Sequence, residues 1–159
     1  MSKIEEFKNR IVNNGMNEDD FLEFEKLLRR VRDPYLKRQH CYTAAIQFPT
    51  DRYLQAIKLI QYGLDQFDDS WYSTYTSYLF MGRIYESVRD YPNAYQAYLS
   101  AKNALSSQEE FYIRQISLEL LWMKLHIDNF QYSPEAEEYY QNYQMAAGFS
   151  QSLINNEFK

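Results

Sequence analysis

The chain has 159 residues, of which 45% are hydrophobic and 18% aromatic, and its formal net charge is −5. It contains only 4 Gly and 4 Pro, which is too few for the many short strands and turns of a β-sandwich or barrel. A single Cys excludes an intramolecular disulfide, and with only 2 His it also excludes a Cys-rich or His-rich metal site. The net negative charge disfavours nucleic acid and anionic membranes as partners.

The acidic surplus lies in the last third of the chain. Residues 106–159 carry 3 basic and 8 acidic side chains, whereas residues 1–40 carry 9 basic and 8 acidic ones. The opening MSKIEEFKNR is polar, unlike a signal peptide, and the sequence has no run of about 18 apolar residues that would span a membrane. We therefore expect a cytoplasmic protein.

Apolar residues recur at helical spacing along the whole chain, and capping residues or helix breakers separate the runs. Asn17 is the expected N-cap of the second helix, Thr50 or Asp51 that of the fourth, and Asp68-Asp69 that of the fifth. The pattern predicts eight helices, at about residues 3–14, 18–32, 35–47, 52–67, 71–88, 91–105, 106–127 and 134–148. No low-complexity tract or flexible linker divides them, so we expect one domain over residues 1–148 and a frayed tail over 149–159.

One stretch, residues 75–108, carries a repeat pattern of large and small side chains. The pattern consists of Tyr78, Met81-Gly82, Tyr85, Ala94, Tyr98 and Ala101. These offsets resemble those of the tetratricopeptide repeat (TPR), a helix hairpin of about 34 residues. Small residues at 82, 94 and 101 would let two helices approach closely, with tyrosines filling the space beside the crossing. Ser106 departs from the family, which usually has Pro there.

The flanking segments follow the pattern more weakly. Anchored on the Ala of the second helix, the spacing is 94 − 56 = 38 residues upstream and 136 − 94 = 42 downstream, and residues 3–32 do not match. Stacked hairpins bury a core that one hairpin cannot. The resemblance therefore implies an all-α fold, a right-handed α-α superhelix (a TPR-like solenoid) of about four antiparallel helix hairpins, with a concave face lined by the first helices.

The resemblance also implies which side chains face that groove, where the family commonly holds an extended peptide or a helix of another protein. The expected partner-binding residues are Arg38, Tyr42, Thr76, Leu79, Phe80, Arg83, Glu86, Trp122 and Asp128. Some family members clamp a C-terminal carboxylate with Lys and Asn, but here those positions hold Leu79 and Arg83, so that ligand is not expected. The neighbouring Leu118, Leu121 and Leu125 fit a core equally well.

Two charged segments allow both a functional and a structural interpretation. A basic cluster around Asp33-Pro34 would contact an anion, or form a solvated face with pairs such as Glu25 with Arg29; the net acidity favours the second. Its members are Arg29, Arg30, Arg32, Lys37 and Arg38. Residues 135–143 (EAEEYYQNY) would bind a basic partner, or form a helix whose Glu side chains complement its own N-terminal dipole.

No catalytic constellation is evident. His40 and Cys41 are adjacent, so on a helix they point apart, and Cys41 is expected to be a small buried residue. The sequence has no phosphate loop, zinc spacing or nucleophile elbow, so we expect no enzyme activity, cofactor or metal.

These observations predict a non-catalytic module that binds another protein or a peptide. One alternative is a small acidic immunity or antitoxin-like protein that masks a toxin or nuclease. Others are a bacterial signalling-peptide sensor or a homo-oligomeric scaffold.

Overall fold

The computed structural model describes residues 2–67, 70–131, 133, 134, 137, 138 and 141. Across these residues it is all-helical and has no strand, which confirms the all-α part of the predicted fold class. The elements are α1 (Lys3–Asn14), α2 (Glu18–Arg29), α3 (Pro34–Ala45), a 3-10 turn η1 (Thr50–Arg52), α4 (Tyr53–Gln66), α5 (Trp71–Ser87), α6 (Tyr91–Asn103) and α7 (Glu110–Ile127). Most of the predicted eighth helix and the whole of the predicted tail lie outside the described residues.

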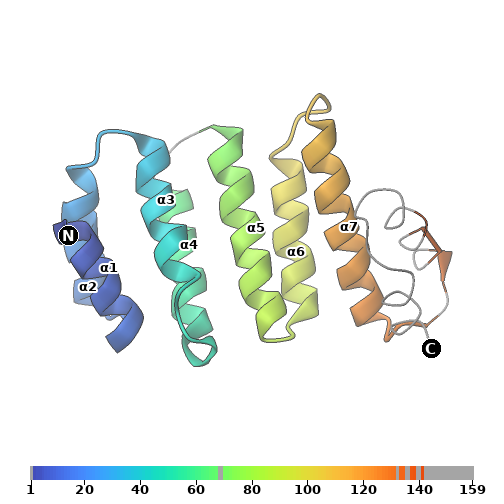
Figure 1. The fold of residues 1–159 in the computed structure, drawn as a ribbon, viewed down its shortest axis with the longest axis horizontal. Helices are drawn as coiled ribbons and strands as arrows, with labels where there is room; N and C mark the ends of the chain where they lie inside the picture. Colours follow the sequence, from blue (N-terminus) through green and yellow to red (C-terminus); the bar gives the residue numbers. More distant parts are fainter. Residues whose placement is uncertain (1, 68–69, 132, 135–136, 139–140, 142–159) are drawn as a thin grey trace.

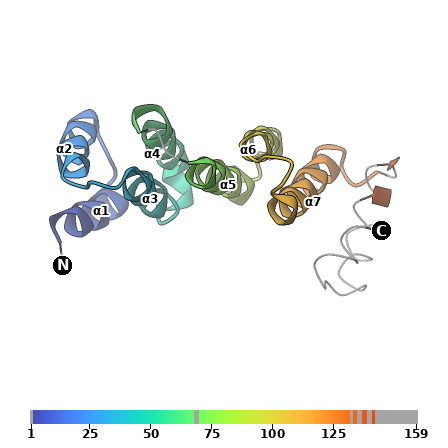
Figure 2. The same cartoon turned by 90° about the horizontal axis from the view of Figure 1, so that it is seen from above.

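The helices form a row of packed neighbours (Figure 1). Seen from above, α1, α3, α5 and α7 lie in one layer, and α2, α4 and α6 lie in a second layer behind it (Figure 2). α3 packs on α4, α5 packs on α6, and α1, α3 and α5 also contact one another in sequence order. The architecture is therefore a stack of helix hairpins.

Local capping explains several boundaries. Gly15, at φ 86°, ends α1 and donates its N–H to Ile11 O at 2.9 Å. Asn17 caps α2 as predicted: its Oδ1 accepts from Asp20 N at 2.9 Å, and its own N–H donates to Asp20 Oδ2 at 2.9 Å. These bonds satisfy backbone donors that the first turn of a helix leaves without partners.

Two predicted helix starts are wrong. Neither Thr50 nor Asp51 caps α4, because residues 50–52 form the 3-10 turn and α4 begins after Arg52 without a side-chain cap. α7 begins at Glu110 and not at Ser106, because Ser106 O accepts from Glu109 N at 3.1 Å in a separate turn. The predicted Asp68-Asp69 cap of α5 lies outside the described residues.

The α5–α6 hairpin depends on the missing side chain of Gly82. A Cβ built on Gly82 would lie 2.6 Å from Cδ1 of Tyr98 and closer still to Cε1. Tyr98, Ala94 and Ala101 on α6 are fully buried. The small residues of the repeat pattern therefore lie at the helix contact, as the sequence predicts, and the Tyr98 ring occupies the space that Gly82 leaves.

A buried lysine joins α1 to α3. Lys8 is 7% exposed, and its Nζ lies 3.0 Å from Thr43 Oγ1, 3.2 Å from His40 Nδ1 and 3.3 Å from Glu5 Oε1. Burial lowers the pKa of His40, and the neighbouring Lys8 charge lowers it further, against an opposing effect of Glu5. The neutral imidazole is the form that accepts from Lys8.

Replacing Gly82 with Ala should destabilise the fold. Ala is the better helix former by about 1 kcal/mol, but the added methyl meets the Tyr98 ring, and overpacking costs about 1–3 kcal/mol. We expect a net loss in the free energy of unfolding, measured by urea denaturation. In a Tyr98→Leu background the ring is gone, so Gly82→Ala should cost less there; an equal cost in both backgrounds would contradict the proposed clash.

The His40 environment predicts a pH dependence of stability. Its pKa in the folded state lies below the ordinary value of 6.5, so the unfolded state binds a proton first and stability falls as the pH drops through and below that value. Thermal melts between pH 7.5 and 5 should show this loss, and His40→Gln should reduce it. A pH profile unchanged by His40→Gln would show that other groups cause the loss.

Candidate functional site

A cleft lies between α5 and α7, which we call the α5–α7 cleft. It encloses about 450 Å³, and α6 contributes no side chain to its lining. Its walls are Tyr72, Tyr75, Thr76, Leu79, Phe80 and Arg83 of α5, and Phe111, Tyr112, Gln115, Ile116 and Glu119 of α7. The structure thus brings together four of the predicted partner-binding residues: Thr76, Leu79, Phe80 and Arg83.

One end of the cleft is aromatic. Tyr112 is the centre of this group, with its ring centroid 5.5 Å from Trp71, 6.1 Å from Tyr72, 5.3 Å from Tyr75 and 5.4 Å from Phe111, all in edge-to-face geometry. Trp71, Tyr72 and Phe111 remain 37%, 40% and 68% exposed. The first residues of α5 and α7 therefore present a group of large rings to solvent.

The group extends to a third helix. Tyr72 lies 6.2 Å from the ring of Tyr35 at the start of α3. We call the whole set the aromatic row: Tyr35, Trp71, Tyr72, Tyr75, Phe111 and Tyr112. Contiguous exposed apolar surface of this kind commonly marks an interaction site.

The other end of the cleft holds an ion pair. Arg83 Nη2 lies 3.0 Å from Glu119 Oε1, with the arginine side chain 51% exposed and the glutamate 23% exposed. Burial raises the pKa of Glu119, because Arg83 offsets only part of the lost hydration. Burial by itself would lower the pKa of Arg83. The neighbouring Glu119, Tyr98 and Glu86 have the larger effect, and the Arg83 pKa is raised.

Glu86 lies beside the cleft and not in its wall. Its Oε1 accepts a hydrogen bond of 2.7 Å from the hydroxyl of Tyr98 on α6. Burial, with help from the Glu86 charge, raises the pKa of Tyr98, so the hydroxyl stays protonated and can donate. α6 thus fixes a second carboxylate behind the Arg83–Glu119 pair.

Tyr42 supports the cleft from behind. It is 4% exposed, and its ring stacks on that of Phe80 at 5.1 Å. Phe80 lines the cleft while its ring rests on α3. Tyr42 therefore supports the cleft wall, and its ring face is covered.

Arg38 was predicted to face the groove, but the structure places it in the interior, 5% exposed. Its Nε donates to Phe67 O at 2.7 Å, and its Nη1 donates to Ser73 Oγ at 2.9 Å and to Thr74 Oγ1 at 2.6 Å. The guanidinium thus joins α3 to the end of α4 and the start of α5. Since these acceptors occupy it, Arg38 is not available to a ligand on the surface.

Trp122 and Asp128, the predicted partner-binding residues around α7, are not among the described residues that line the cleft. Trp122 packs its ring against His126 at 4.8 Å and Phe130 at 5.4 Å, and Asp128 caps the helix end, 3.8 Å from Lys124 Nζ. Glu119, and not Trp122, faces Arg83. The third repeat was anchored on Ala136, beyond α7, so the unknown length of the intervening turn shifted every first-helix position.

Sequence reasoning therefore missed the α7 wall of the cleft, formed by Phe111, Tyr112, Gln115, Ile116 and Glu119. The available signal was the similar start of the two helices, Trp71-Tyr72 in α5 and Phe111-Tyr112 in α7. Aligning the helices on these aromatic pairs places Glu119 opposite the α5 wall.

Other predicted features have structural roles. Leu118 and Leu125 are buried, which supports the core alternative, and Cys41 is 1% exposed, with burial raising its pKa to about 12. Arg29 pairs with Glu25 at 2.5 Å, as predicted. Residues 135–143 lie mostly outside the described residues, so their two interpretations stay open.

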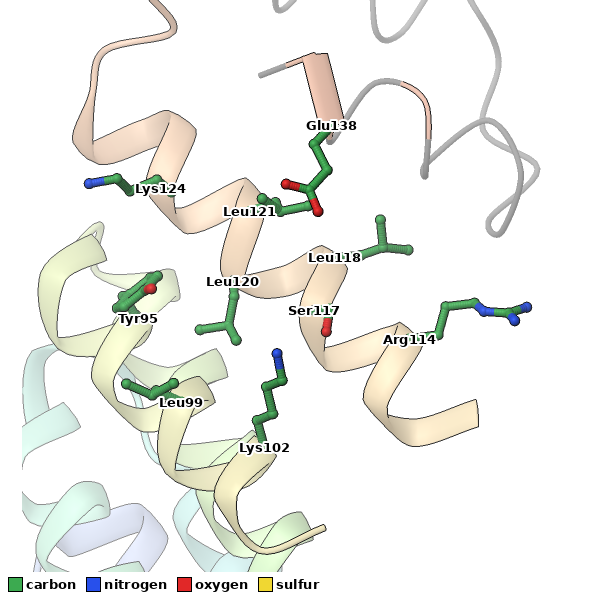
Figure 3. A pocket seen from close by; sticks show the side chains of 10 residues that line it. All are labelled: Tyr95, Leu99, Lys102, Arg114, Ser117, Leu118, Leu120, Leu121, Lys124 and Glu138. Atoms are coloured by element: carbon green, nitrogen blue, oxygen red, sulfur yellow. The ribbon is translucent and has the colours of Figure 1, made fainter. Parts of the chain in front are cut away.

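A second hollow, of about 410 Å³, lies between α6 and α7 (Figure 3). Lys102, Arg114 and Lys124 line it, together with apolar side chains. Of the described residues beyond α7, Glu138 lines it. The α5–α7 cleft is lined by two described helices and contains four of the predicted partner-binding residues, so we place the candidate site there.

Within the described ranges, no group of three or more His, Cys, Asp or Glu side chains is arranged to hold a metal ion. The helices of the same ranges are each too short or too polar to cross a membrane. No family model, curated protein or solved structure matches this chain. What the structure defines is an all-helical protein of stacked hairpins with an aromatic cleft.

Removing the Arg38 side chain should lower stability. Arg38→Ala leaves Phe67 O and the hydroxyls of Ser73 and Thr74 without their donor, and we expect a loss of about 2–4 kcal/mol in the free energy of unfolding. Arg32→Ala, an exposed residue of the same basic cluster, should change stability by less than about 0.5 kcal/mol. Chemical denaturation of the two variants tests this; equal small effects would contradict the buried role of Arg38.

Proposed function

We propose that this chain is a non-catalytic binding module, a TPR-like stack of helix hairpins that holds a segment of another polypeptide in the α5–α7 cleft. The main observation behind the proposal is that the predicted groove residues of α5 line the same cleft as rings of the exposed aromatic row. Buried aromatic anchors supply most of the binding energy in many protein interfaces.

The dimensions of the cleft suit a short extended segment. Tyr72 and Arg83 lie at its two ends on one helix, about 16 Å apart at 1.5 Å per residue. An extended chain rises about 3.3 Å per residue, so about five residues would span that length. The segment would begin on aromatic rings and end at an ion pair.

The chemistry of the walls also suits a polypeptide. Tyr and Trp offer large contact area at low entropic cost, because each has only two side-chain torsions to fix. Gln115 is exposed on the α7 wall, and its amide can donate to and accept from a peptide backbone. A ligand in the cleft would therefore find apolar anchors and a hydrogen-bonding partner.

The TPR-like part of the proposal is supported by the α5–α6 hairpin. Gly82 lies directly against the Tyr98 ring, and the small residues Ala94 and Ala101 are buried on the same helix as Tyr98. The contacts of α1 with α3 and of α3 with α5 are those expected when first helices of successive hairpins are neighbours.

Peptides selected from a random library against the whole protein test the proposal. Phe111→Ala should weaken a selected peptide at least about tenfold, equivalent to about 1.4 kcal/mol, because it removes an exposed ring from the cleft. Leu54→Ala on α4 is the matched control, since Leu54 is 64% exposed and lies outside the cleft, and it should leave the dissociation constant unchanged. The proposal would be overturned if the dissociation constants of the selected peptides changed with neither Phe111→Ala nor Tyr72→Ala.

A further inference from the structure

We infer that the α5–α7 cleft selects a basic segment, whose arginine side chains lie on the exposed rings of the aromatic row and reach the carboxylate of Glu119. The inference rests on the proposed function and deepens it by naming the chemistry of the partner.

The first argument is the charge around the cleft. Among the described residues, Glu119 and Glu86 lie beside one cation, Arg83, at one end of the cleft. At the other end Glu109 and Glu110 precede Phe111, and the buried Arg38 bonds Ser73 and Thr74 at the start of α5. Lys102 of α6 and Arg114 and Lys124 of α7 line the separate hollow between those two helices. The surroundings of the cleft are therefore net negative, and a basic segment complements them.

The second argument is the state of the aromatic rings. A cation is attracted to the face of Trp, Tyr or Phe. Elsewhere in the described residues the protein places its own cations over rings: Arg10 over Phe7, Lys37 over Phe67, Arg52 over Phe48 and Lys58 over Phe21. Over the described part of the chain, no cation lies over a ring of the aromatic row. The exposed rings of Trp71, Tyr72 and Phe111 are thus open to a ligand's cation.

The third argument is the hydration of Glu119. Its side chain is 23% exposed, and among the described residues its cationic partner is Arg83. Burial makes its charge costly, and a second cation would offset that cost. Arginine suits the place better than lysine, because a planar guanidinium can stack on a ring and bond a carboxylate bidentately.

An acidic segment fits less well. Its carboxylate would reach Arg83 only beside Glu119 and Glu86, and like charges at short range repel. A purely apolar segment would cover Glu119 without giving it a partner, which adds a desolvation cost.

Three sets of fluorescein-labelled hexapeptides on the whole protein test the inference. The sets share one aromatic residue and carry arginine, its neutral isostere citrulline, or glutamate at the remaining variable positions. By fluorescence anisotropy, the arginine set should bind at least about tenfold more tightly than the citrulline set, with the difference decreasing as salt is raised.

Glu119→Gln should remove most of the preference for arginine over citrulline. Glu18→Gln is the matched control, because Glu18 is an exposed glutamate at the start of α2, and it should leave the preference intact. Circular dichroism checks that both variants fold. The comparison of arginine with citrulline on the unmodified protein needs no variant, so it decides the matter even if Glu119→Gln is unfolded.

The outcomes separate the two proposals. Citrulline or glutamate peptides that bind as tightly as arginine peptides, and that lose affinity with Phe111→Ala, overturn the basic preference and leave the cleft as the binding site. Equal loss of the arginine preference in Glu18→Gln and Glu119→Gln would show a general charge effect and also overturn the inference. Binding by none of the three sets overturns the proposed function itself.

Discussion

The contact of Gly82 with Tyr98 is the constraint on which the described structure depends most. Without a side chain at position 82, α5 approaches α6 until the Tyr98 ring fills the gap, and a methyl group would collide with that ring. The buried Tyr98 hydroxyl then donates to Glu86 and holds that carboxylate beside Arg83. One small residue therefore fixes the hairpin and the charged end of the cleft together, since both depend on where the tyrosine lies.

The cleft that results has two chemically different ends on parallel first helices. Rings from the first residues of α5 and α7 meet around Tyr112, whereas the ion pair of Arg83 with Glu119 joins the same helices about three turns further along α5 and about two turns further along α7. This difference between the ends would fix the direction of a bound segment, because its apolar side chains would favour the aromatic end of the cleft and its charged side chains the end with the ion pair. It is also why the proposed partner is a polypeptide with mixed side chains and not a purely apolar surface.

Two buried cations connect the hairpins elsewhere. Lys8 joins α1 to α3, and Arg38 joins α3 to the end of α4 and the start of α5. A buried charge is tolerated only when hydrogen-bonding partners replace water, and both side chains have such partners. The basic cluster around Asp33-Pro34 therefore divides: Arg38 belongs to the interior, whereas Arg29 forms an exposed pair with Glu25.

By itself the sequence determined what depends on near neighbours: the helical class, the end of the first helix near residue 14, the Asn17 N-cap and the small residues of the α5–α6 hairpin. In each of these the interacting residues are close in sequence or follow a known repeat. Only the tertiary structure decided that Arg38 is buried, that Glu119 faces Arg83, and that Trp71 and Phe111 share one aromatic row. These pairings join separate helices, and they depend on the length of turns and on hydrogen bonds between distant segments, which helical periodicity does not encode.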